Sequence, residues 1–220
     1  MSGAQRALVI GTSGGIGTAL ATELANRGAE VTGLSRSGDG LDVTDEASVV
    51  AALGRLDAGY DLVFVATGTL GEPEKALSAL APEAFLEQIR TNALGPALVL
   101  KHALPLLASD RRAVFAVLSA RVGSIGDNAI GGWYSYRASK ACLNQLMHTA
   151  AIEIRRTHRN ALCVALHPGT VATEFTARYA GRHRTVEPDE AARNLLDVLD
   201  GLTPEQSGGF YDYSGKPVPW

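Results

Sequence analysis

Tyr136 and Lys140 are the two side chains whose types and spacing are best suited to moving a proton. They are four residues apart, so on a helix they share one face. A lysine ammonium beside a phenol stabilises the phenolate and lowers the pKa of the tyrosine towards the working pH range. The pair therefore predicts a proton donor for a carbonyl group. The alternative is an amphipathic helix with a surface lysine.

A glycine-rich segment follows the first apolar run and reads Gly-Thr-Ser-Gly-Gly-Ile-Gly from position 11 to position 17. Its glycines permit a tight turn, close approach of a phosphate and close packing of the following helix. The free N–H groups at the start of that helix attract an anion. The segment predicts a pyrophosphate cradle made by Gly11, Ser13, Gly15, Ile16 and Gly17. The alternative is a glycine-rich turn without a ligand.

The same letters also match the Gly-x-Ser-x-Gly nucleophile elbow of α/β hydrolases, with Ser13 as the nucleophile. His167 or His183 would then complete a catalytic triad. An elbow needs an oxyanion-hole loop from an earlier strand, and only ten residues precede Gly11. The hydrolase is therefore a remote alternative.

Two further positions bear on a nucleotide cofactor. The second expected strand ends without the acidic residue that would bind the ribose 2′-hydroxyl of NAD, and Arg36 stands there instead. A guanidinium suits a 2′-phosphate, so NADP(H) is preferred and NAD(H) stays possible. The alternative is a solvated arginine. Asp42 and Val43 close a short third strand, where the Asp42 carboxylate would accept a hydrogen bond from an adenine amino group.

The elements that must position these residues follow from the apolar pattern. Strands are expected at 7–10, 30–34, 41–43, 61–66, 113–118, 161–167 and 209–213, and helices at 15–27, 45–56, 82–107 (interrupted), 133–157 and 188–199. This alternation predicts a Rossmann-type, doubly wound parallel sheet of about seven strands between two helix layers. Residues 1–220 are expected to form a single NAD(P)-binding domain, with ligands at the carboxyl ends of the strands.

Composition narrows the remaining possibilities. The chain has 220 residues, 46% of them hydrophobic, and a net charge of −3, which excludes disorder as the main state and disfavours nucleic-acid binding. Cys142 and Cys163 form no disulfide framework or metal motif, so a reducing compartment is expected. No apolar stretch predicts a signal peptide or a membrane span. The expected location is the cytoplasm.

Taken together, the motifs resemble those of the short-chain dehydrogenase/reductase family over essentially the whole chain. The glycine segment and the Tyr136-x-x-x-Lys140 pair carry the resemblance. Further matches are Asp42-Val43, Asn92 before Gly95-Pro96, and Pro168-Gly169-x-Val171-x-Thr173. Residues 123–128, 131–137 and 211–217 resemble the C-factor and carbonyl-reductase-like branch.

The resemblance implies a role for each matching residue. Tyr136 would be the general acid in reduction and the base in oxidation, and Lys140 would bind the nicotinamide ribose. Asn92 would expose a backbone carbonyl that holds a relay water, where Gly95-Pro96 disturbs the helix. The remaining cofactor contacts would come from Ala66, Thr67 and Gly68 at the adenosine ribose, and from Pro168, Gly169, Val171 and Thr173 at the nicotinamide carboxamide. The long helices would form the interface of a homodimer or homotetramer.

Two departures from the family pattern affect the expected activity. Residues 65–68 read Val-Ala-Thr-Gly in place of Asn-Asn-Ala-Gly, and Ala120 stands where the substrate-orienting serine is usual. Ser119 or Ser124 would take over that role, or Tyr136 would hold the substrate carbonyl alone. The expected function is NADP(H)-dependent interconversion of a small carbonyl compound and its alcohol. The alternative is a catalytically weak or inactive dinucleotide-binding sensor or scaffold.

The substrate lid of the family falls at about residues 174–187 in this chain. This segment is short, which predicts a site open to several small carbonyl compounds. Its arginines, Arg178, Arg182 and Arg184, would meet an anionic substrate or lie in a solvated loop.

Overall fold

A parallel sheet forms the centre of the protein. The computed structural model describes residues 5–176 and 185–220, and within them six parallel strands follow the order β2-β1-β3-β4-β5-β6. The strands are β1 (Arg6–Ile10), β2 (Glu30–Leu34), β3 (Leu62–Val65), β4 (Ala113–Leu118), β5 (Ala161–His167) and β6 (Phe210–Asp212). The central strands are continuously apolar because helices cover both faces of the sheet. The predicted Rossmann-type fold is confirmed, with six strands in place of about seven.

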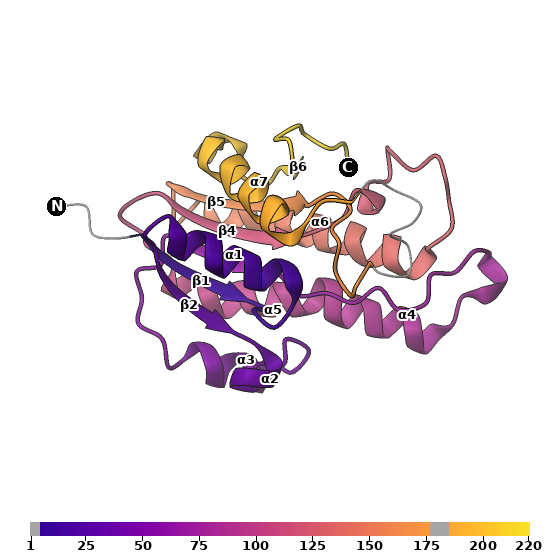
Figure 1. Ribbon diagram of the computed structural model, residues 1–220, viewed down its shortest axis with the longest axis horizontal. Coiled ribbons are helices and arrows are strands. Elements are labelled where there is room, and N and C mark those ends of the chain that lie inside the picture. Colours follow the sequence, from indigo (N-terminus) through magenta and orange to yellow (C-terminus); the bar gives the residue numbers. More distant parts are fainter. Residues whose placement is uncertain (1–4, 177–184) are drawn as a thin grey trace.

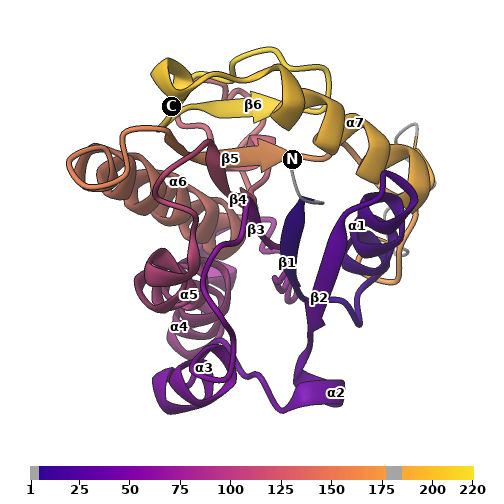
Figure 2. The same ribbon diagram turned by 90° about the vertical axis from the view of Figure 1, so that its left-hand side faces the viewer.

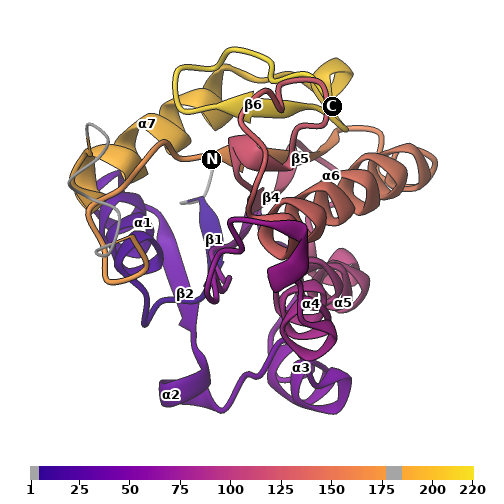
Figure 3. The ribbon, with the colours of Figure 1, turned by 90° about the vertical axis from the view of Figure 1, so that its right-hand side faces the viewer.

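Helices form a layer on each side of the sheet (Figures 1 and 2). Figure 3 shows α1 and α7 on one face, and α3, α4, α5 and α6 on the other. Their bounds are α1 (Gly15–Asn26), α2 (Arg36–Asp39), α3 (Glu46–Leu53), α4 (Pro82–Ile89), α5 (Gly95–Ala103), α6 (Tyr134–Ile154) and α7 (Pro188–Gly201). Each layer encloses its own apolar core, with Phe64 between the sheet and α1/α7 and Phe115 on the side of α6.

Short helical turns connect these elements. They are η1 (Leu77–Ala79), η2 (Arg90–Leu94), η3 (Leu104–Leu106), η4 (Arg121–Gly123) and η6 (Pro204–Gln206). The predicted interruption of the 82–107 helix is confirmed, because η2 is a π-helical segment between α4 and α5. None of the described helices combines the length and the apolar character needed to cross a membrane.

The expected strand at 41–43 is wrong. Local hydrogen bonds take up this segment: Asp42 Oδ1 accepts from the backbone N–H and the hydroxyl of Thr44, at 2.9 and 2.7 Å. The Ser48 hydroxyl accepts from the Asp42 N–H and donates to the Gly40 carbonyl. An aspartate that closes a turn on its own backbone competes with strand pairing, and here the turn is the outcome.

The strand order places a switch point at the carboxyl ends of the strands. From β1 the chain runs to β2 on one side, and then returns to β3 on the other side of β1. The connections that leave the carboxyl ends of β1 and β3 therefore diverge, and this switch point is where doubly wound sheets bind ligands. The glycine segment follows β1, and residues 66–68 follow β3.

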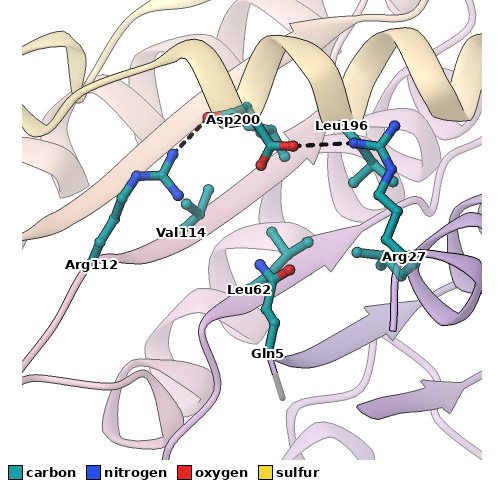
Figure 4. A pocket seen from close by; sticks show the side chains of 9 residues that line it. Gln5, Arg27, Leu62, Arg112, Val114, Leu196 and Asp200 are labelled. Carbon is teal, nitrogen blue, oxygen red and sulfur yellow. Dashed lines mark hydrogen bonds and ion pairs between the residues drawn. The ribbon is translucent and has the colours of Figure 1, made fainter. Parts of the chain in front are cut away.

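The opposite edge of the sheet has a different role. A small pocket lies where β1, β3 and β4 begin, and Figure 4 shows Arg27 and Arg112 among its lining residues. Arg27 pairs with Asp200 at 3.1 Å, and Arg112 donates to the Leu199 carbonyl at 2.6 Å. Arg27 thus joins the end of α1 to α7, and Arg112 joins the start of β4 to the end of α7, so this pocket is a structural joint.

Candidate active site

The glycine segment is a tight turn that tolerates no side chain at two of its positions. Gly11 has φ +99°, and its N–H donates to the Leu34 carbonyl at 2.8 Å. A Cβ at Gly17 would lie 2.1 Å from the Gly11 carbonyl oxygen, and one at Gly15 would lie 2.9 Å from the Thr173 side chain. Gly17 therefore lets the start of α1 lie directly on the turn after β1, and Gly15 lets the segment after β5 approach it closely.

The start of α1 can receive an anion. Gly14 is the N-cap residue, and because glycine has no side chain it leaves the first N–H groups of the helix uncapped. The first N–H groups of a helix, here from Gly15 onwards and including Ile16, have no partner within the helix. Ser13 is exposed beside them. Backbone donors and the positive end of the helix therefore converge on one exposed turn, as a phosphate requires.

The end of β3 lies beside the turn after β1, at the switch point. The Ala66 N–H donates to the Ile10 carbonyl at 2.8 Å, and Thr67 Cγ2 would lie 3.1 Å from a Cβ placed at Gly11. The Thr67 hydroxyl is buried and has no hydrogen-bond partner among the described residues. A buried polar atom without a partner costs free energy, so this hydroxyl fits a ligand that would supply one.

The residues proposed for the adenosine end lie beyond β2. Arg36 is exposed at the start of α2, and its guanidinium makes no ion pair with the described residues. Asp42 retains one carboxylate oxygen, and hydrogen bonds from Thr44 hold the pKa of this group below its ordinary value. The Val43 side chain packs closely on Gly95, where a Cβ would lie only 2.8 Å from Val43 Cγ2.

The segment after β5 lies against the glycine cradle. Gly169 adopts φ +80° over the ring of Tyr213, and Val171 is buried and bridged to Val186. Pro168 begins this segment directly after β5. The Thr173 side chain lies close to Gly15, 2.9 Å from where a Cβ would stand. Most of the expected lid, with Arg178, Arg182, His183 and Arg184, lies outside the described residues.

Tyr136 and Lys140 lie in the first turns of α6 and are both buried. The Lys140 Nζ is 5.9 Å from the centre of the Tyr136 ring and donates to the Leu118 carbonyl, at the end of β4, at 2.8 Å. Burial lowers the pKa of Lys140 to about 7. A Cβ at Gly123 would lie 2.7 Å from Lys140 Cβ, so η4 packs directly on this helix.

The lowered phenol pKa, expected with a nicotinamide cation in the same cleft, stays a prediction, because the described residues act on the phenol by burial alone. Burial raises the pKa of Tyr136 above its ordinary value of 10.0 in the protein without cofactor. Lys140 does not reverse this effect, because its amine is itself buried and bonded to Leu118. Tyr136 is therefore a protonated phenol at neutral pH, which is the form that donates a proton.

Asn92 lies in η2, where the helix departs from α geometry. Pro96 has no N–H, so it cannot donate to the Asn92 carbonyl four residues earlier. The prediction that Gly95-Pro96 disturbs this helix is confirmed. The Asn92 carbonyl, which the resemblance assigns to a relay water, thus lacks the N–H donor that a regular α-helix would give it.

The Asn92 side chain has a second task that the sequence did not reveal. It is fully buried, and its amide clamps Thr69: Oδ1 accepts from the Thr69 N–H at 2.7 Å, and Nδ2 donates to the Thr69 carbonyl at 2.8 Å. Nδ2 also donates to Ser139, whose hydroxyl donates to the Tyr136 carbonyl. A Cβ at Gly68 would lie 3.2 Å from Asn92 Oδ1 and 3.7 Å from Lys140 Nζ. Asn92, Lys140 and Gly68 therefore meet at one point.

Both serines near Ala120 use their hydroxyls in hydrogen bonds within the fold. The Ser119 hydroxyl is buried and donates to Asn144 Oδ1 on α6 at 2.6 Å. The Ser124 hydroxyl is buried and donates to the Pro219 carbonyl. Each hydroxyl is thus committed to the fold, and Ala120 follows β4 with extended backbone at the edge of the site.

Two more side chains of this region were missed by the sequence analysis. Ser139 lies inside the Tyr-Arg-Ala-Ser-Lys segment, and its position next to Lys140 was an available signal. Glu74 carried no such signal, because its partner Ser135 is 61 residues away in the chain.

Comparisons with known proteins agree with this geometry. A family model described as Enoyl-(Acyl carrier protein) reductase matches residues 10–202. The 1-hydroxy-2-glutathionyl-2-methyl-3-butene dehydrogenase of Rhodococcus sp. strain AD45 is 34% identical over 97% of this chain and 98% of its own length. The C-signal protein of Myxococcus xanthus is 38% identical over 64% of this chain and 84% of its own length. A short-chain dehydrogenase/reductase of Burkholderia multivorans with bound NADP superposes with a TM-score of 0.86, at 29% identity, over 99% of this chain and 100% of its own.

The chain belongs to the short-chain dehydrogenase/reductase family, and the predicted resemblance, including its C-factor branch, is confirmed. It is an NAD(P)-dependent oxidoreductase, and its similarity to an NADP-bound structure supports NADP(H) binding. The hydrolase alternative gains no support: His167 lies half-buried beside the ring of Tyr213, with 6.5 Å between ring centres. No described histidine is hydrogen-bonded to Ser13, and His183 lies outside the described residues.

Replacing Lys140 with Met tests the burial of its amine. The unfolded chain holds the Lys140 proton up to about pH 10.5, whereas the folded protein releases it near pH 7. Stability therefore rises with pH between these values. We expect the free energy of unfolding of the wild type, relative to Lys140→Met, to increase by roughly 1 kcal/mol or more from pH 7 to pH 9.5. Urea titrations at both pH values measure it, and a difference that does not change with pH would contradict an amine with a lowered pKa.

Proposed function

We propose that this protein is an NADP(H)-dependent oxidoreductase that interconverts a small carbonyl compound and its alcohol. The observation that carries the proposal is the meeting of Lys140, Asn92 and Gly68 beside the protonated phenol of Tyr136. This cluster lies at the carboxyl edge of the sheet, where the cradle after β1 also lies. The site thus combines a proton donor with a place for a dinucleotide.

Named residues of the chain fit the cofactor. The pyrophosphate would lie on Gly11, Ser13, Gly15, Ile16 and Gly17, the adenosine end on Arg36, Asp42, Val43, Ala66, Thr67 and Gly68, and the nicotinamide end on Lys140, Pro168, Gly169, Val171 and Thr173. When bound, NADPH supplies a hydride to the carbonyl carbon. The free guanidinium of Arg36 favours a 2′-phosphate over a 2′-hydroxyl.

The chain itself would manage the proton. The Tyr136 phenol, whose pKa burial raises above its ordinary value of 10.0, donates to the substrate oxygen during reduction and accepts the proton back during oxidation. Lys140 orients the ribose and offers positive charge once the phenol begins to ionise. The Asn92 carbonyl holds the water that returns a proton to the site. Catalysis then rests on positioning and one tuned donor.

The side chains around the phenol support this substrate class. The rings of Trp133 and Phe175 have their centres 6.1 and 6.2 Å from that of Tyr136. Aromatic walls favour an apolar body next to the reacting carbonyl group. The Rhodococcus relative is named for the oxidation of an alcohol, which supports an alcohol/carbonyl pair here.

The wider context is part of the same proposal. Residues 1–220 would act as one NAD(P)-binding domain in the cytoplasm, where the thiols of Cys142 and Cys163 stay reduced; cell fractionation tests the location. Leu86, Leu94 and Ile152 are exposed on or beside the long helices and suit a homodimer or homotetramer. Sedimentation equilibrium measures the oligomeric state.

Replacing Tyr136 with Phe separates an enzyme from a sensor. The change removes the proton donor and leaves the ring, so kcat for NADPH oxidation with a panel of aldehydes and diketones should fall by at least about 100-fold. NADPH affinity, measured by fluorescence titration, should stay within about twofold. Tight NADPH binding without turnover in the wild type would leave only the sensor or scaffold alternative, which Ala120 favours.

Replacing Arg36 with Ala tests the cofactor preference. Loss of a charged hydrogen bond to the 2′-phosphate costs about 1.5–3 kcal/mol, or roughly 10- to 100-fold in kcat/KM for NADPH. The value for NADH should hardly change, because NADH lacks this phosphate. Steady-state kinetics with both cofactors give the two ratios. An equal loss for NADH and NADPH would place Arg36 outside the 2′-phosphate site.

Restoring a serine at position 120 should raise activity. Ala120 leaves the substrate carbonyl without the usual hydroxyl donor, and one such donor is worth about 100- to 1000-fold in kcat. We expect Ala120→Ser to raise kcat by about tenfold or more, and Ala129→Ser, in an exposed loop, to leave it unchanged. An unchanged kcat in Ala120→Ser would show that Tyr136 holds the carbonyl without a partner.

A further inference from the structure

The helix that carries Tyr136 and Lys140 begins in an unusual turn. Residues 131, 132 and 133 all have positive φ, at +72°, +65° and +57°. Trp133 is the only such residue, other than glycine, in the described part of the chain, and it is also the N-cap of α6. A left-handed tryptophan is strained and persists only where its surroundings hold it.

Glu74 supplies what this helix start lacks. The side chain of Trp133 does not cap α6, and the first turn of the helix contains no acidic residue. The buried Glu74 carboxylate instead accepts from the Ser135 N–H, at 3.2 Å, and from the Ser135 hydroxyl. The Glu74 carbonyl accepts from the Trp133 N–H at 2.6 Å. One residue of the loop after β3 thus serves as the cap and the negative charge that a helix N-terminus favours.

Arg137 holds the same turn from its acceptor side. Its guanidinium donates to the carbonyls of Gly131 and Gly132, at 3.2 and 2.9 Å, and to the Val122 carbonyl at 3.2 Å. The N–H groups of Trp133 and Ser135 therefore bond to Glu74, and the carbonyls of Gly131 and Gly132 bond to Arg137. The turn leads directly into Tyr136, and the Trp133 ring contacts the Tyr136 ring.

We propose that Glu74 is a positioning residue for catalysis, which sets the start of α6 and thereby the place of the Tyr136 phenol. This proposal rests on the proposed function, because it assigns Tyr136 the proton transfer. Glu74 touches neither the cofactor cradle nor the Lys140 anchor at Leu118. Its loss should therefore lower kcat and leave cofactor binding intact.

The test compares Glu74→Ala with Glu74→Gln. Alanine removes both carboxylate oxygens that accept from Ser135 and keeps the backbone carbonyl. A displacement of about 1 Å at a reacting group lowers the rate by up to about 100-fold. We expect kcat to fall by about 10- to 100-fold in Glu74→Ala, with the NADPH dissociation constant within about twofold of the wild type. Glutamine can accept from the Ser135 N–H and donate to the Ser135 hydroxyl, so Glu74→Gln should recover kcat to within about threefold.

A spectroscopic signature accompanies the kinetics. In a Trp220→Phe background only Trp133 emits as a tryptophan, because the chain has two tryptophans. Its emission should shift to longer wavelength in Glu74→Ala and stay unchanged in Glu74→Gln. Asp45→Ala is the matched control, because the Asp45 side chain caps α3 through the Ala47 N–H, and the bond from Asp45 to Asp42 comes from its backbone N–H, which alanine keeps. It should change neither kcat nor the emission.

Several outcomes overturn the proposal. These are an unchanged kcat and emission in Glu74→Ala, an equal loss in Glu74→Gln, or an equal loss in Asp45→Ala. If Glu74→Ala does not fold, Ser135→Ala decides: it removes one of the two donors, and it should lower kcat three- to tenfold and shift the Trp133 emission. Failure of the proposed function is seen separately, since Tyr136→Phe would then turn over like the wild type.

Discussion

Burial of the Lys140 amine at the end of β4 is the constraint around which the candidate site is arranged. A charged or half-charged amine can remain there only with a hydrogen-bond partner, and the Leu118 carbonyl provides it. Gly123 lets η4 pack on the helix beside this lysine, because a Cβ there would lie 2.7 Å from Lys140 Cβ. A position that looks like an ordinary turn in the sequence is thus tied to one buried side chain.

The phenol and the amine divide proton and charge between them. In the protein without cofactor, burial keeps Tyr136 protonated and moves the pKa of Lys140 towards neutrality. Neither group holds a stable charge that would be costly in an apolar site. In the proposed reaction, a cationic nicotinamide beside the pair would favour the phenolate.

The sequence could predict those features that are determined by residues close together in the chain. The continuous apolar runs around Phe64 and Phe115 and the missing N–H of Pro96 act within a few residues, and the sheet and the broken helix were predicted from them. The strand at 41–43 failed because Asp42 closes its own turn. The raised pKa of Tyr136 and the cap from Glu74 arise from packing between distant segments, which no spacing in the sequence reveals.

The contacts of Arg27 and Arg112 with α7 show that the two ends of the strands have separate roles. Residues at the amino ends of the strands stabilise the fold, and residues at the carboxyl ends form the candidate site. The length of a strand separates the two groups. Substitutions more than about 7–10 Å apart usually act independently on stability. Proteins of this fold can therefore change the loops at the carboxyl ends of the strands while the contacts at the amino ends keep the molecule folded.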